Sequence, residues 1–272
     1  MSMTIDRTFL HKFTLLYVED DQMIRENLYT MLSKVFDNIL VAKNGKEGLD
    51  IFFKHQEEGQ TPIDLIISDV NMPQVTGITM VKKMREFDTD IPAIFTTAYT
   101  DSKYLLDAIT LHIDYYAIKP INVKELVINI QKILVRIDAF RILKQQKSEI
   151  EQYKSIINDN SIVVETDKDG NIKSANKKFC KLSMFSEEEI IGKSPSIVRH
   201  KEMPSYVYKG LWDTISAGDT WKGVVKNMNQ EGNAYYLDLA VFPIFDRYEH
   251  IIHYKSIAFE ISEEEWKSRK FY

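Results

Sequence analysis

The sequence predicts an α/β unit with a parallel sheet, then a long helix, and then an α+β unit. Five short apolar runs alternate with amphipathic segments over the first 137 residues, which is the pattern of a parallel sheet with helices on both faces. From residue 122 a helical pattern runs on without Gly or Pro as far as Gly170. A hairpin, short helices and long alternating strands fill the remainder.

The apolar runs are the expected strands of a (βα)5 unit with flavodoxin-like topology. In such open sheets, ligands bind beyond the carboxyl ends of the strands, where the winding direction switches. The residues that end the strands are therefore the first candidates for function. The runs are Thr14–Val18, Asn38–Ala42, Asp64–Ser68, Ile91–Thr97 and Tyr115–Ile118.

Carboxylates follow two of these runs. Glu19 and Asp20 come directly after the first run, and Asp69 comes after the third. If these two strands are neighbours, three carboxylates meet in one small cleft. Carboxylates that lie this close together raise one another's pKa unless a cation neutralises them. Mg²⁺ is the usual cation for oxygen ligands. The sequence therefore predicts a magnesium site at this edge of the sheet.

The fourth and fifth runs add a hydroxyl and an ammonium to this edge. Thr97 ends the fourth run, and Lys119 follows the fifth, before Pro120, in an X-Pro bond that is a candidate for the cis form. A carboxylate nucleophile beside a metal and a cation is the set that acyl phosphate formation needs. We therefore expect phosphoryl transfer to Asp69.

The motifs YVEDD, SDVNMPQVTG, TTA and YYAIKP, in this order, resemble the receiver domain of bacterial two-component response regulators. The resemblance implies that Asp69 is the phosphoacceptor and that Thr97 and Lys119 contact the phosphoryl oxygens. It also implies that Tyr116 is the aromatic switch residue, which turns inward on activation. A phosphorylating histidine kinase is the implied partner.

The same resemblance implies the metal ligands, which are Glu19, Asp20, Asp69 and the backbone carbonyl of Asn71. Other residues in and between these motifs are expected to have local structural roles. Asp21 is the expected N-cap of the first helix, and Asn44 and Gly45 form a turn before the second. Gly77 is expected to be a loop residue with unusual φ.

The helix after the fifth strand is predicted to be about 35 residues long, or roughly 50 Å at 1.5 Å per residue. Leu143, Ile150 and Ile157 recur every seven residues, with Gln146 and Tyr153 between them. Either a short parallel coiled coil between two copies or a single solvated connector fits this pattern. The segment has no histidine, so the chain by itself is not expected to be a hybrid histidine kinase.

The segment after the helix has the elements of a curved sheet over a pocket. Asp169 and Gly170 are placed at the turn of its first hairpin, and Ser186 with Glu189 forms a capping box for a short helix. Three longer alternating strands follow. From Ile156 to Ser262 the sequence resembles a PAS domain.

A narrower resemblance lies within this region. The stretch SIVRHKEMPSYVYKGLWDTISAGDTWKGVVKN is similar to the flavin-binding PAS domain of the bacterial aerotaxis receptor, although Lys201 and Glu202 stand where that family has Pro and Asp. The resemblance implies FAD as a cofactor. A PAS domain with a packed core and no cofactor stays an alternative, and haem stays a minor one. The implied flavin residues are Arg199, His200, Trp212, Trp221 and Asn227.

These patterns divide the chain of 272 residues into four segments. We expect a receiver at 1–137, a helical or coiled-coil linker at 138–157, a PAS sensor domain at 158–264 and a tail at 265–272. Two domains of ordinary size agree with the chain length.

Composition limits the expected partners and location. The formal net charge is −5, and no cluster of five or more Lys and Arg is present, which disfavours nucleic-acid binding. No apolar run approaches the roughly 20 residues of a membrane span, and the start lacks the apolar core of a signal peptide. We expect a cytoplasmic bacterial signalling protein that is not an enzyme and that acts through a homodimer and an unknown downstream protein. Its PAS domain is expected to sense redox state or oxygen, or to mediate protein contacts. The alternatives are the regulatory front of a larger signalling enzyme, a kinase or a cyclic-dinucleotide protein, and a PAS module without cofactor that serves only for dimerisation.

Overall fold

The computed structural model describes residues 4–57, 60–98, 111 and 113–269. The chain divides between Lys144 and Gln145 into two compact units, called here the N-terminal and C-terminal units. Within the described ranges, no helix is long and apolar enough to cross a membrane.

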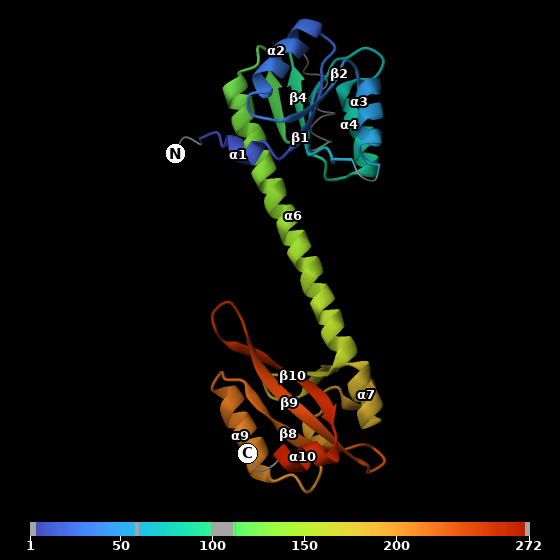
Figure 1. Ribbon diagram of the computed structural model, residues 1–272, viewed down its shortest axis with the longest axis vertical. Coiled ribbons are helices and arrows are strands. Elements are labelled where there is room, and N and C mark those ends of the chain that lie inside the picture. The colour runs from blue at the N-terminus through green and yellow to red at the C-terminus, as the bar shows by residue number, and fades with distance from the viewer. Residues whose placement is uncertain (1–3, 58–59, 99–110, 112, 270–272) are drawn as a thin grey trace. The chain divides into compact units, whose positions relative to one another are not determined.

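The N-terminal unit is built on a parallel sheet of five strands in the order β2-β1-β3-β4-β5, which confirms the predicted flavodoxin-like order (Figure 1). A helix expected between β4 and β5 falls on residues that lie outside the described ranges. The elements are α1 (Arg7–Leu10), β1 (Thr14–Val18), α2 (Gln22–Leu32), β2 (Asn38–Ala42), α3 (Gly45–Lys54), β3 (Leu65–Asp69), α4 (Gly77–Phe87), β4 (Ala93–Thr97), β5 (Tyr115–Ile118) and α6 (Val123–Asn160).

A separate apolar core covers each face of this sheet. Alternate residues of a strand point to opposite faces, so Leu15 and Tyr17 of β1 enter one core and Leu16 and Val18 the other. Helices α1, α2 and the first part of α6 cover the first face, and α3 and α4 cover the second, as Figure 1 shows. Strands β1 and β3 are buried along their whole length, so only their ends meet solvent.

Local caps place the helices that follow β1 and β3. The side chain of Asp21 accepts a hydrogen bond from the Ile24 amide at 2.9 Å, which confirms its predicted role as the N-cap of α2. The expectation for Gly77 is wrong, because this residue has no positive φ and begins α4. A Cβ at Gly77 would lie 2.1 Å from the carbonyl oxygen of Asp69, so close approach of the two backbones explains the glycine.

Residues 4–13, which precede β1, fix the first half of α6 to the sheet. Leu10 of α1 is fully buried in the core that also holds Leu134 of α6. The side chain of Gln131 accepts a hydrogen bond from the Asp6 amide at 2.7 Å and donates one to the carbonyl of Thr4 at 3.1 Å. The N-terminal segment therefore holds α6 through both packing and backbone hydrogen bonds.

Ion pairs continue this attachment further along α6. Lys12 binds Asp138 at 2.8 Å, and Arg141 pairs with the buried carboxylate of Asp64. Asp64, immediately before β3, also accepts a hydrogen bond from the Thr14 amide at 2.8 Å. The helix is thus tied to the N-terminal unit as far as Arg141.

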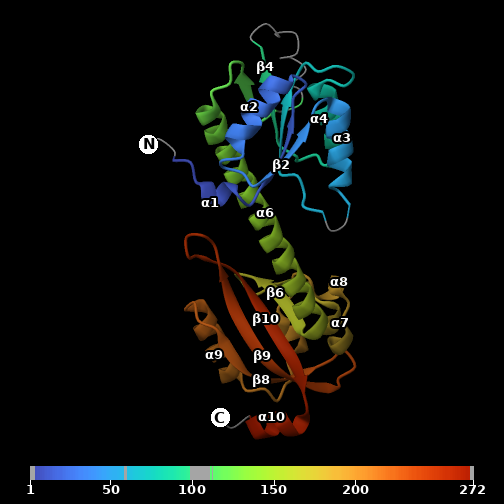
Figure 2. The same cartoon turned by 45° about the horizontal axis from the view of Figure 1, so that its top comes forward.

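The C-terminal unit holds an antiparallel sheet of five strands in the order β7-β6-β10-β9-β8, with the long strands β8, β9 and β10 side by side (Figure 2). This confirms the predicted α+β class. The elements are β6 (Ile162–Asp167), β7 (Ile172–Ala175), α7 (Lys177–Ser183), α8 (Glu187–Ile190), a 3-10 helix (Pro195–Val198), α9 (Ser205–Ser216), β8 (Trp221–Met228), β9 (Ala234–Phe245), β10 (Ile251–Ile261) and α10 (Glu263–Arg269).

Turn and cap residues of this unit lie where the sequence predicted them. Gly170, in the β6–β7 turn, has a φ of +86°, a conformation that favours glycine. Ser186 and Glu189 form the predicted capping box at the start of α8. Alternate residues of the sheet pack with α7, α8 and α9 around the core.

We predict that Leu10→Ala lowers the free energy of unfolding of the N-terminal unit by about 2–5 kcal/mol, because it removes a fully buried side chain between α1 and α6. Hydrogen exchange, which resolves the two units, should show faster exchange in β1 and in α6 up to residue 134. Met23→Ala is the control, because Met23 is 74% exposed and its loss should change stability by less than about 0.5 kcal/mol. Unchanged exchange in Leu10→Ala would contradict the role of the N-terminal segment.

Candidate functional site

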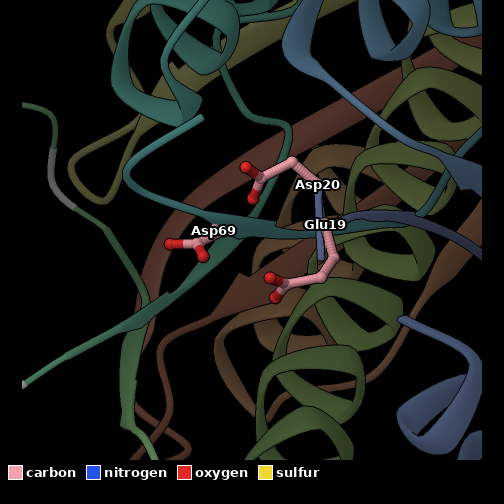
Figure 3. Close-up of side chains that lie close together, drawn as sticks. All are labelled: Glu19, Asp20 and Asp69. Atoms are coloured by element: carbon pink, nitrogen blue, oxygen red, sulfur yellow. The ribbon is translucent and has the colours of Figure 1, made fainter. Parts of the chain in front are cut away.

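Three carboxylates meet at the carboxyl edge of the parallel sheet. Glu19 and Asp20 follow β1, and Asp69 is the last residue of the neighbouring strand β3. One oxygen atom from each carboxylate lies within 4.8 Å of the others, and the three side chains surround a common space in Figure 3. Glu19 and Asp69 are buried, whereas Asp20 is exposed. The adjacency of β1 and β3 brings these residues together.

Lys119 supplies a positive charge to this site. Its Nζ lies 2.5 Å from Oδ2 of Asp69 and 3.0 Å from Oε1 of Glu19. Burial by itself would lower the pKa of Lys119, but the hydrogen bonds to Asp69 and Glu19 raise the pKa above its usual value. Lys119 is therefore a charged ammonium in contact with both buried carboxylates. The peptide bond before Pro120 is cis, as predicted.

Glu19 is the most strongly perturbed carboxylate of the site. Burial and the nearby charge of Asp69 raise its pKa to about 7, although the hydrogen bond from Lys119 acts in the opposite direction. Oε2 of Glu19 is buried and has no hydrogen-bond donor within the described ranges. A divalent cation would supply the missing partner and favour the ionised form. The oxygen donor set of Glu19, Asp20 and Asp69 therefore fits Mg²⁺.

The other predicted residues of this edge lie around the carboxylates. The Asn71 amide donates a hydrogen bond to Oδ1 of Asp69 at 3.2 Å. Thr97 ends β4, the strand next to β3, and its hydroxyl donates to the carbonyl of Ala98. Tyr116 of β5 packs with its ring centroid 6.2 Å from that of Phe95. The Tyr116 hydroxyl is buried without a hydrogen-bond partner among the described residues, so this ring points into the protein.

Arg25 is a residue of this site that sequence reasoning missed. Its guanidinium donates to the backbone carbonyls of Glu19, at 2.7 Å, and Asp20, at 3.0 Å. It thereby holds the backbone of the acidic pair from the first turns of α2. An arginine in an amphipathic helix gives no sequence signal for this contact.

The C-terminal unit contains a cavity of about 230 Å³ between the sheet and α9. Its walls are mostly apolar and include Val164, Leu237, Leu239 and Ala258 from the sheet. Its polar lining includes Arg199 and Asn227, which lie in segments joined by an isolated β-bridge. The cavity is therefore mainly apolar, with polar groups at Arg199 and Asn227.

The structure places three of the five expected flavin residues at this cavity, which are Arg199, Trp212 and Asn227. The other two lie elsewhere. Nδ1 of the buried His200 accepts a hydrogen bond from the Glu202 amide, and the residue does not line the cavity. The ring of Trp221 lies over Gly223, where a Cβ would come within 2.6 Å of it, and lines a separate groove.

Three aromatic residues of the cavity, which are Phe179, Tyr208 and Tyr254, were not predicted. Tyr208 of α9 carries the guanidinium of Arg199 over its ring, with Cζ 4.1 Å from the centroid. Tyr254 of β10 meets Trp212 in an edge-to-face contact at 5.6 Å. Tyr254 follows the period of two in β10, which marks it as inward-facing, but that pattern does not separate a cavity wall from a packed core.

Two family models match the chain. The response regulator receiver domain matches residues 15–131, and the PAS domain matches residues 159–263. The first match contains every residue of the carboxylate site, and the second contains the cavity of the C-terminal unit.

Known proteins are similar to parts of this chain. The probable transcriptional regulator ycf27 of Cyanidium caldarium is 40% identical over 123 residues, which are 45% of this chain and 47% of the relative. The chain thus spans about half the length of this curated relative.

Two solved structures are also similar to parts of the chain. A response regulator receiver domain protein from Clostridium thermocellum is 23% identical with a TM-score of 0.43, over 47% of this chain and 98% of its own. The light-state Aureochrome1 LOV domain is 21% identical with a TM-score of 0.40, over 43% of this chain and 94% of its own. From the two family matches, the chain contains a response regulator receiver domain at residues 15–131, followed by a PAS domain at residues 159–263.

Proposed function

We propose that this protein is a phosphorylation-controlled regulator in which Asp69 accepts a phosphoryl group from a sensor histidine kinase. This proposal rests on one observation, which is that Asp69 lies beside Lys119 and two further carboxylates at the carboxyl edge of the parallel sheet. This arrangement provides a nucleophile and a positive charge within 2.5 Å of each other.

In the proposed reaction, a carboxylate oxygen of Asp69 forms a bond to phosphorus while the bond from phosphorus to the histidine nitrogen of the kinase breaks. Lys119 and Thr97 would receive the charged phosphoryl oxygens. Bound Mg²⁺ would offset negative charge on the carboxylates and the phosphoryl group. Glu19, Asp20, Asp69 and the backbone carbonyl of Asn71 would hold this ion.

We propose that the output of this receiver runs through protein contacts. The matched relative is named a transcriptional regulator, but this chain resembles it over only about half of that protein's length. Beyond the receiver, this chain has a PAS domain, and its formal net charge of −5 does not favour DNA. A cytoplasmic location is part of this proposal.

We propose that the PAS domain is a ligand-binding sensor. FAD does not fit its cavity well, because two of the five expected flavin residues lie elsewhere and the volume of about 230 Å³ is small. Pockets for drug-sized ligands measure about 300–1,000 Å³, and a dinucleotide exceeds that ligand size. A smaller ligand suits the cavity better.

We propose that two copies associate in parallel through the linker part of α6. The apolar side chains of the seven-residue repeat are exposed in a single chain, by 63% at Leu143, 52% at Ile150 and 40% at Ile157. Among the described residues, nothing in the same chain buries them. In a parallel pair, the seam is the line along which these repeat residues of the two helices meet. Glu149 of one copy then faces Lys154 of the other. Because the receiver holds α6 as far as Arg141, a change in the receiver would reach this seam.

Asp69→Asn should abolish labelling of the protein by acetyl phosphate in the presence of Mg²⁺, because it removes the nucleophilic oxygen. Mass spectrometry or a phosphate-affinity gel measures the phosphorylated fraction. Asp50→Asn, at an exposed position on α3, is the matched control and should label like the wild type. Equal labelling of Asp69→Asn and the wild type would rule out Asp69 as the acceptor.

The affinity for Mg²⁺ should fall about tenfold between pH 8 and pH 6. Glu19 has a pKa of about 7 without metal, so it is ionised above this pH and becomes protonated below it, and a carboxylate must be deprotonated to bind the ion. Isothermal titration calorimetry measures the affinity. Glu19→Gln should bind more weakly with a flat profile over this range, whereas Glu26→Gln should keep the wild-type profile. A flat wild-type profile would disprove the assignment.

Leu143→Lys with Ile150→Lys should shift a dimer to the monomer, because two charges enter the proposed seam. Analytical ultracentrifugation measures the mass, and the phosphate mimic beryllofluoride should change the dimerisation constant of the wild type. Ser148→Lys, off the seam, is the control. A wild type that is monomeric with and without beryllofluoride would refute association through α6.

A further inference from the structure

The size of the PAS cavity limits its ligand to one or two aromatic rings. An engineered apolar cavity of about 150 Å³ binds benzene, whereas drug-sized ligands occupy about 300–1,000 Å³. The volume of about 230 Å³ lies between these cases. A bicyclic compound with a small substituent is therefore near the upper limit.

The walls of the cavity suit a flat apolar group. Trp212 and Tyr254 present ring surfaces in edge-to-face contact at 5.6 Å, and Phe179 adds a third ring. Aliphatic side chains of the sheet, such as Leu239, also line the cavity. Aromatic ligands gain both apolar burial and ring contacts from such walls.

One end of the cavity carries a positive charge without a counter-charge. The Arg199 guanidinium donates to the carbonyl of Met203 at 3.1 Å and lies over the ring of Tyr208, and no carboxylate of the described ranges is within ion-pair distance. The nearby Lys226, in contrast, pairs with Glu202 at 2.7 Å. A guanidinium has five N–H donors, so Arg199 keeps donors for an anion.

Two more polar groups lie at this end. The Tyr208 hydroxyl is buried and has no hydrogen-bond partner within the described part of the chain. Asn227 is only 8% exposed and lines the cavity. A buried hydroxyl without a partner is costly, and a carboxylate oxygen would accept hydrogen bonds from both Tyr208 and Arg199.

We propose that the PAS cavity binds an aromatic carboxylate of one or two rings. The carboxylate accepts hydrogen bonds from Arg199 and Tyr208, and the ring system lies against Trp212 of α9 and the sheet face that carries Tyr254. This inference rests on the proposed sensor function of the PAS domain and names its ligand class. The charge at Arg199 makes the cavity select an acid over a neutral compound of the same shape.

The test compares 2-naphthoate with its neutral isostere 2-naphthamide by isothermal titration calorimetry on the full chain. The acid should bind at least tenfold more tightly than the amide. Arg199→Gln should reduce the affinity for the acid to that for the amide and leave the amide unchanged, whereas Arg199→Lys should regain part of the difference. Arg247→Gln, at an exposed arginine that stacks on Tyr248, is the matched control and should behave like the wild type.

The other outcomes separate this inference from the proposed functions. Equal binding of acid and amide, or tighter binding of FAD than of 2-naphthoate, would overturn the ligand class and keep the cavity as a binding site. Absence of binding by all three compounds would overturn both the ligand class and the sensor function of the cavity. Labelling of Asp69 is measured separately and tests the receiver alone.

Discussion

The receiver depends on holding three like charges together at the ends of two buried strands. Two like charges about 4 Å apart repel by about 1 kcal/mol in water and about 4 kcal/mol near a protein surface. Lys119 contacts Glu19 and Asp69, and within the described ranges no ion pair reaches Asp20. The single ammonium of Lys119 therefore neutralises only part of the negative charge of the three carboxylates. The remaining negative charge favours binding of a divalent cation at this site.

Strand β3 connects this chemistry with the rest of the receiver. Asp69 is its last residue, and Asp64, immediately before its first, binds both the Thr14 amide and Arg141 of α6. The strand is buried throughout, so it cannot shift without repacking both cores. The proposed phosphoacceptor Asp69 and an anchor of the long helix thus lie at opposite ends of one rigid element of five residues.

The PAS domain has the reverse electrostatic arrangement. Its cavity is mainly apolar, and the charge at its edge is an arginine without a carboxylate partner in the described part of the chain. The receiver gathers negative charge at the carboxyl edge of its sheet, whereas the PAS domain presents a positive charge to a mainly apolar cavity. This difference in charge is why we propose different ligands for the two sites, a metal with a phosphoryl group for the first and an organic anion for the second.

Residue order alone was enough to predict both folds, because the period of the apolar runs, the turn glycines and the caps are local features, as the strand Thr14–Val18 and the N-cap Asp21 show. The acidic edge was also predictable, since parallel strands bring their carboxyl ends to one side. Contacts between segments that are distant in sequence were not predictable. Examples are the hydrogen bonds of Arg25 to the backbone of Glu19 and Asp20, those of Gln131 to the backbone of residues 4 and 6, and the ion pair of Arg141 with Asp64. Their side chains meet only when the units fold, because no local pattern records which residues become neighbours across the core. The same reason explains why His200, the sequence neighbour of the cavity residue Arg199, and Trp221 do not line the cavity.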